Sequence, residues 1–296
     1  MNCIWGSSPA DIYIGGNRST WSIASLFHYD GNSWTPVTFA TVYDFGNIFA
    51  MTGFGPNDIY TVGARFDTGT DSSVIMHFGR SQWVEQHVTN GRALLSVWGS
   101  SPSDVWTGGH AGTLFHSDGA TWSRVTVDPR LDVKSISGMA SNDIYLLGTH
   151  VNDDVNYYLN YTVLYHYDGA KWRIIDSMSV ASSQFGTRFG EAKLGYIGGT
   201  LYSVGYGIYA MHSDGWQKVL NTDYAIQWLY ASSQSTAFAV GQGSLIYYFD
   251  GQSWEQLTNV VGSGHSLRGA WATATDAFIV GSNDLQTDRT LVLHGR

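Results

Sequence analysis

The chain has 296 residues, of which 43% are hydrophobic, 15% are aromatic and only 13% are charged. A soluble domain ordinarily contains about 25% charged residues, and here Ser, Thr, Asn and Gly supply the polarity instead. The net charge of −9 and the lack of a long apolar run argue against nucleic acid as a partner and against membrane insertion.

One sequence unit recurs seven times along the chain, and its clearest copy spans residues 94–125. Seven copies in 296 residues give a period of about 42, the length of a four-stranded propeller blade. A glycine closes the second segment of every copy, at Gly16, Gly63, Gly109, Gly148, Gly205, Gly241 and Gly281.

Each copy predicts four short strands. In residues 94–125 these are LLSVWG, DVWTGG, LFHSDG and a last strand that opens with Trp122. An Asp-Gly pair between apolar segments is a strong hairpin signal, and no helical periodicity appears. We therefore predict an all-β fold, a seven-bladed β-propeller of four-stranded antiparallel blades in a single domain, 1–296. The predicted blades are 1–42, 43–92, 93–131, 132–186, 187–224, 225–265 and 266–296.

The seventh copy stops at residues 293–296, where its fourth strand should begin. The last blade is therefore predicted to lack its outer strand. Either the chain is a fragment of a longer protein, or the edge of the last sheet is left open at a cost in exposed backbone groups. We expect a fragment.

The motif WGSSPxDVW followed by DGxxW resembles the propeller repeats of bacterial proteins and, more distantly, kelch blades. The spacing differs from that of the sialidase Asp-box, in which Trp follows Asp by five residues, because Asp118 and Trp122 are four apart. The resemblance implies a propeller and says little about activity, since such repeats occur in proteins with unrelated roles.

Residues that recur once per copy are expected to be structural. The third strand of most copies carries a histidine that we expect to pack between blades and to donate to a backbone carbonyl. Aspartates in the turns are expected to accept backbone N–H groups. The single cysteine, Cys3, excludes an internal disulfide and is expected in the core. No catalytic motif, metal site or cofactor is predicted. The repeated histidines are His28, His77, His116, His166, His212 and His294.

The insertions that interrupt the repeat lie between second and third strands (17–25, 64–73, 149–162 and 282–290) or between blades (38–47, 176–190 and 258–266). In an antiparallel blade these connections share one face. Their aromatic and Arg side chains suit contacts with a peptide or a sugar, although they could equally cover the mouth of the propeller. The predicted ligand-binding residues are Trp21, Tyr43, Arg65, Tyr157, Tyr158, Arg188 and His265.

These observations predict a non-enzymatic binding or scaffold module of an exported bacterial protein, extracellular or in the cell envelope. Its partner would be a protein or a glycan bound on the face that carries the insertions. One alternative is a glycan hydrolase or lyase with a site at the funnel mouth, using residues such as Arg188 or His265. Another is an assembly factor that docks on a protein complex.

Overall fold

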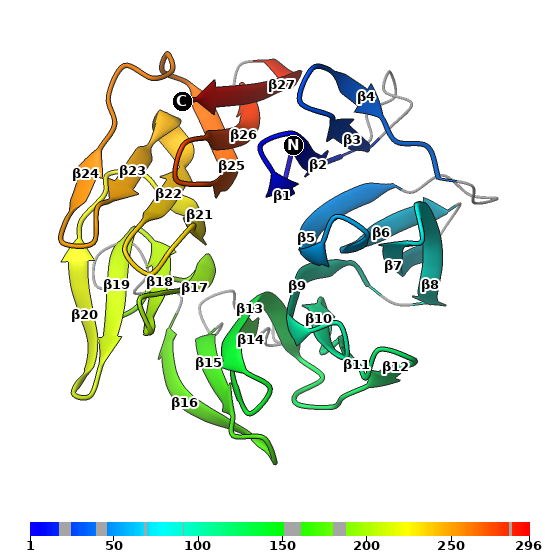
Figure 1. Ribbon diagram of the computed structural model, residues 1–296. Coiled ribbons are helices and arrows are strands. Elements are labelled where there is room, and N and C mark those ends of the chain that lie inside the picture. Colours follow the sequence, from blue (N-terminus) through cyan, green and yellow to red (C-terminus); the bar gives the residue numbers. More distant parts are fainter. Residues whose placement is uncertain are drawn as a thin grey trace. The chain divides into compact units, whose positions relative to one another are not determined.

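A computed structural model describes residues 1–17, 25–39, 46–67, 70–90, 92–150, 161–179, 188–283 and 286–296. Six of its sheets contain four strands each, and the last contains three (Figure 1). The chain is thus an all-β seven-bladed propeller of antiparallel blades, and the predicted fold class and three-stranded last sheet are confirmed. In the described residues the only helical segment is one 3-10 turn, η3 (Gln242–Ser244).

The sheets follow one another along the chain, and within each one the strands pair in sequence order. The first sheet comprises β1 (Cys3–Ser8), β2 (Asp11–Gly15), β3 (Leu26–Tyr29) and β4 (Trp34–Pro36). The second comprises β5 (Asn47–Gly55), β6 (Asp58–Asp67), β7 (Thr70–Gly79) and β8 (Gln82–Asn90). The third comprises β9 (Leu94–Ser101), β10 (Asp104–Gly109), β11 (Leu114–Ser117) and β12 (Trp122–Arg124).

The fourth sheet comprises β13 (Leu131–Ala140), β14 (Asp143–His150), β15 (Tyr161–Tyr167) and β16 (Trp172–Ser179). The fifth comprises β17 (Lys193–Ile197), β18 (Thr200–Gly205), β19 (Gly207–His212) and β20 (Gly215–Leu220). The sixth comprises β21 (Ile226–Ala231), β22 (Ala237–Gly241), β23 (Ile246–Phe249) and β24 (Trp254–Gln256). The seventh comprises β25 (His265–Ala272), β26 (Ala277–Asn283) and β27 (Gln286–Gly295).

The chain groups into two units, Met1–Ile136 and Ser137–Arg296, which are described separately. In the first unit the opening strands β1, β5 and β9 contact one another in turn, and a core cluster joins the second and third sheets. In the second unit β17, β21 and β25 do the same, with apolar clusters between neighbouring sheets. Cys3 is completely buried, as expected.

A tryptophan stands near the start of each described fourth strand, and in the second, third and sixth sheets its ring contacts the sheet before it. The ring of Trp122 meets Tyr60 of the second sheet edge-on, with 6.1 Å between ring centroids. Trp254 meets Tyr202 of the fifth sheet in the same way at 6.4 Å. This edge-to-face arrangement is favourable for aromatic pairs, and it explains why the repeat requires a large ring at this place.

In four sheets the glycine that closes the second strand is required by a close approach of backbone, at Gly63, Gly109, Gly241 and Gly281. A Cβ added to Gly109 would lie 1.9 Å from the carbonyl oxygen of Ala93, which precedes the first strand of the same sheet. At Gly63 the distance to the carbonyl oxygen of Asn47 would be 1.8 Å. No side chain fits in this space, so the recurrent glycine is a steric requirement of the fold.

We predict that Gly109→Ala destabilises the protein by about 3 kcal/mol or more, because backbone and not a flexible side chain must move. Gly55→Ala is the matched control, since a Cβ there meets no atom within 4 Å. Thermal and urea unfolding of both variants measures the difference. Equal stability of the two variants would contradict the steric explanation.

The Asp-Gly turns between third and fourth strands behave as expected. The carboxylate of Asp118 accepts the backbone N–H groups of Thr121 at 2.8 Å and Ala120 at 2.9 Å. These two bonds lower the pKa of Asp118 below its ordinary value of 3.8. Asp30, Asp168 and Asp250 make the same pair of bonds, and their pKa values are lowered for the same reason.

Because the pKa of Asp118 is lower in the folded state, its ionised form stabilises the fold above about pH 4, and this contribution is lost as the pH falls through the folded-state pKa. Asp118→Asn retains a carbonyl acceptor but cannot titrate. We therefore expect the melting temperature of the wild type to fall further than that of Asp118→Asn between about pH 5 and pH 2.5. Parallel acid curves would show that the turn carboxylate contributes nothing.

Two of the predicted insertions are regular structure. Residues 64–67 and 70–73 extend the paired strands β6 and β7, and residues 282–283 and 286–290 extend β26 and β27. In these two places the insertion lengthens a hairpin. Longer hairpins reach further from the sheet while their backbone groups stay paired.

Candidate functional site

Five sheets share a polar pair that could be mistaken for catalytic machinery. In each, the Nε2–H of the third-strand histidine donates to an aspartate at the start of the second strand or one residue before it, at 2.7 to 2.9 Å. Each imidazole also contacts an aromatic ring of that second strand, stacked in four sheets and tilted by 30° between Tyr145 and His166. The triplets are Asp11–His28–Tyr13, Asp58–His77–Tyr60, Asp104–His116–Trp106, Asp143–His166–Tyr145 and Asp276–His294–Phe278.

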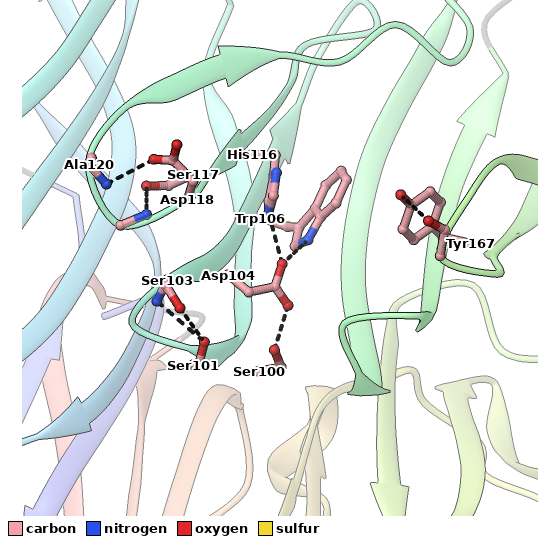
Figure 2. Close-up of polar contacts among 12 residues, drawn as sticks. Ser100, Ser101, Ser103, Asp104, Trp106, His116, Ser117, Asp118, Ala120 and Tyr167 are labelled. Atoms are coloured by element: carbon pink, nitrogen blue, oxygen red, sulfur yellow. Dashed lines mark hydrogen bonds and ion pairs between the residues drawn. The ribbon is translucent and has the colours of Figure 1, made fainter.

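This arrangement corrects the predicted role of the histidines. They bond to a carboxylate and not to a backbone carbonyl, and they stack within their own sheet. Figure 2 shows the third sheet, where the Asp104 carboxylate accepts Trp106 Nε1–H at 2.9 Å, His116 Nε2–H at 2.8 Å and the Ser100 hydroxyl. The pair therefore fastens the turn before the second strand to the third strand, which is a structural task.

His212 was expected to belong to this set, and that expectation is wrong. In the fifth sheet Ala210 stands opposite Tyr202, while His212 pairs with Gly215 at the end of a shorter hairpin. In the sixth sheet Tyr248 takes the position of the histidine, opposite Phe238. Across the described residues, no group of three or more His, Cys, Asp and Glu side chains could hold a metal ion.

We predict that Asp104→Ala lowers stability by about 3 kcal/mol, because three donors lose a charged acceptor. Asp58→Ala in the second sheet is a matched comparison: His77 is the donor to that carboxylate, and Tyr60 replaces the indole. It should cost about 1 to 2 kcal/mol. Denaturant unfolding of the two variants tests the ranking, and the reverse order would refute it.

Four of the predicted ligand-binding residues, Trp21, Tyr43, Tyr157 and Tyr158, lie outside the described residues. Arg65 is described and lies in β6, where it is only 6% exposed. Its guanidinium forms an ion pair with Glu85 of β8 at 2.5 Å. In this position Arg65 joins the second and fourth strands of one sheet.

Arg188 and His265 belong to the second unit and are held by different neighbours. The Arg188 guanidinium donates to the Asp176 carboxylate and to the Ser177 carbonyl, each at 2.5 Å, and its side chain is 63% exposed. His265 Nδ1–H donates to the carbonyl of Gly262 at 2.9 Å. Arg65, Arg188 and His265 therefore each belong to a separate local network.

Exposed tyrosines lie at the end of the blades that carries the turns between second and third strands and the links to the next blade, which we call the link-bearing end. The sequence analysis did not single them out. In the described residues, three tyrosines have large exposed side chains: Tyr161 at the start of β15, Tyr206 between β18 and β19, and Tyr224 between β20 and β21. In an antiparallel blade the turn between second and third strands shares one end with the link to the next blade. All three therefore lie at the end on which the insertions were predicted to gather.

Two of these tyrosines lie next to glycines. Tyr206 lies between Gly205 and Gly207 in a tight turn, and Gly207 has a φ of 137°. Tyr224 lies against Gly243, where an added Cβ would come 2.7 Å from the ring. The Gly-Tyr-Gly sequence was the available signal for Tyr206; for Tyr224 no short-range signal exists, because Gly243 is 19 residues away. Val260, in the link before β25, is also exposed at this end.

The strand order, the closing glycines and the fourth-strand tryptophans define the class of the chain as a seven-bladed β-propeller, with exposed tyrosines on its link-bearing end. No family model matches the sequence, and no curated protein matches it. The described part of the chain contains no helix with the length and apolar character needed to span a membrane.

Several solved structures share the fold. A structure of YCF48 bound to D1 peptide has a TM-score of 0.67 at 14% identity, covering 100% of this chain and 93% of that chain. YCF48 from Cyanidioschyzon merolae has the same TM-score at 13% identity, with 100% and 95% covered. The computationally designed protein Ika8 has a TM-score of 0.59 at 10% identity, with 99% and 95% covered. At these identities the likeness shows the fold alone.

Proposed function

We propose that this chain is a protein-binding propeller that docks a peptide segment of a partner at the link-bearing end of its blades. The observation that carries the proposal is the placement of Tyr161, Tyr206 and Tyr224 at that end. Likeness in fold to YCF48, which has been seen bound to D1 peptide, supports a protein partner over a glycan. A role as an assembly factor that docks on a protein complex agrees with both.

Tyrosine is well suited to this task. Its ring offers a large apolar area with few rotatable bonds, and its hydroxyl can bond to a peptide backbone. Tyr206 precedes the third strand of the fifth sheet and Tyr224 follows its fourth strand, so both lie at the same end of that sheet. Residues of this type commonly dominate the binding free energy of an interface.

The test is selection of peptides from a random phage-displayed library on the immobilised protein, followed by affinity measurement for one synthetic peptide. We expect Tyr206→Ala and Tyr224→Ala each to weaken binding by about tenfold, with little change in melting temperature. Val219→Ala is the control. Val219 is 45% exposed, as the tyrosines are to a similar degree, but it lies within the fourth strand β20 and not in a turn or link at the link-bearing end.

A glycan array probed with the same protein forms the second arm. Binding or cleavage of a glycan, together with peptides that bind both tyrosine variants as well as the wild type, would refute the proposal. Equal losses for Val219→Ala and the tyrosine variants would place the binding surface on the outer strands.

A further inference from the structure

Five hairpins between third and fourth strands contain the sequence Asp-Gly. In such a pair the main-chain nitrogen of the glycine can attack the carboxyl group of the aspartate, because glycine has no side chain to hinder the approach. The five sites share this local sequence, so the fold decides which of them reacts. These hairpins lie at the end of the blades away from the exposed tyrosines, and the inference does not depend on the proposed function. The aspartates are Asp30, Asp118, Asp168, Asp214 and Asp250.

In four of the hairpins the carboxylate is held by the backbone of its own turn. Asp118 accepts the N–H groups of Ala120 at 2.9 Å and Thr121 at 2.8 Å. Ring closure onto the glycine nitrogen requires the carboxyl group and the main chain to rotate, which breaks both bonds. The bonds also lower the pKa of these carboxyl groups, so less of the reactive protonated acid is present. The other three carboxylates make the same bonds at 2.8 to 3.0 Å and belong to Asp30, Asp168 and Asp250.

The glycines of the same four hairpins are packed against a second turn. A Cβ added to Gly119 would lie 3.1 Å from the Cα of Ser103, in the turn between the first and second strands of its sheet. This neighbour restricts the rotation that ring closure needs. The equivalent contacts join Gly31 to Ala10, Gly169 to Asn142 and Gly251 to Ser235, at 2.7 to 3.0 Å from the added atom.

The fifth sheet lacks the first restraint because its hairpin is shorter. Only Asp214 and the residue before it separate the paired His212 and Gly215. The N–H groups two and three residues after the aspartate belong to Trp216 and Gln217, which already pair with β19. In the part of the chain that the structure describes, the Asp214 carboxylate has one hydrogen bond, from the side-chain amide of Gln217 at 3.4 Å.

The second restraint is also missing there. Gly215 has a φ of 113°, and a Cβ added to it would meet no atom within 4 Å. In this sheet the turn between first and second strands consists of Gly198 and Gly199, which offer no Cβ to the hairpin. Asp214 itself is exposed. Its carboxyl group and the nitrogen of Gly215 are therefore freer to approach each other than the same groups in the other four hairpins.

We propose that Asp214 is a modification site of the folded chain, at which aspartate rearranges to isoaspartate. The nitrogen of Gly215 bonds to Cγ of the protonated Asp214 carboxyl group, loses its proton and expels one water molecule, which leaves a five-membered cyclic imide. Water then adds to an imide carbonyl and breaks its bond to nitrogen. Where the main-chain carbonyl is attacked, the product is isoaspartate. The water lost is regained, so the mass is unchanged and no oxidant or reductant takes part.

The product alters the hairpin without altering its charge. Isoaspartate carries the main chain through the former side chain, which adds one methylene group to the backbone. The extra atom lies between the paired His212 and Gly215, where β19 turns into β20. The modification therefore strains the pairing of the fourth strand at its first residues.

The test compares the folded chain with the same chain in about 6 M guanidinium, each kept for several weeks at neutral pH. Tryptic peptides are separated by liquid chromatography, and electron-transfer fragmentation distinguishes isoaspartate from aspartate of equal mass. In the folded chain we expect isoaspartate to form at least about tenfold faster at Asp214 than at Asp118 or Asp168. In guanidinium the turns are lost, and the rates at these sites should agree within about threefold.

Two matched variants separate geometry from ionisation. Asp214→Asn and Asp118→Asn each place a neutral amide before the glycine, and the amide reaches the same imide with loss of ammonia. Since an amide does not titrate, a difference in carboxyl pKa cannot affect its rate. We expect deamidation at least about tenfold faster in Asp214→Asn than in Asp118→Asn, read from the gain in mass of the corresponding peptide. Asn90-Gly91 can react in the same way, but it lies on a different tryptic peptide.

Three results would overturn the inference. The first is isoaspartate that forms no faster at Asp214 than at Asp118 in the folded chain. The second is a difference between the sites that is as large in guanidinium as in the folded chain, which would assign it to local sequence. The third is equal deamidation of Asp214→Asn and Asp118→Asn, which would remove the geometric cause.

Discussion

Four of the sheets share one backbone contact, in which the glycine that closes the second strand meets a carbonyl at or just before the start of the first strand. At Gly63, Gly109 and Gly241 the space for a side chain is absent, because a Cβ would lie about 2 Å from that oxygen. The approach fixes where the first strand begins, and the three remaining strands follow from it by pairing. In these sheets no other residue fits at the position of the recurrent glycine.

A second contact, the Asp–His pair between the second and third strands, occurs in most blades but not in all. Five blades fasten the turn before the second strand to the third strand through an Asp–His pair, and the fifth and sixth blades do not. The fifth has Ala210 opposite Tyr202, and the sixth has Tyr248 opposite Phe238. Those two blades show that the strands can pair in register without the Asp–His contact. The polar pair adds stability without being a condition of the fold.

The sequence was sufficient to predict the fold class, since the repeat, the Asp-Gly turns and the tryptophans are local patterns. It was not sufficient where one sequence pattern is compatible with two different positions of a residue in the structure. The sequence around Arg65 is compatible with a loop or with an extended strand, and the ion-pair partner of Arg65, Glu85, lies in a different strand. His212 keeps the distance to its glycine, but a shorter hairpin moves it out of the common position. The ring of Tyr224 lies against Gly243, a neighbour that no short-range pattern connects to it.

The burial of Cys3 has a practical consequence. Its thiol is the only one in the chain, it is 0% exposed, and it lies on β1 with its Sγ 3.7 Å from the carbonyl of Gly15. A thiolate must reach solvent before it can be alkylated, so the labelling rate of this sulfur follows the opening of the first sheet. The chain thus carries a native chemical probe of local unfolding at a single place, and no engineered cysteine is needed to use it.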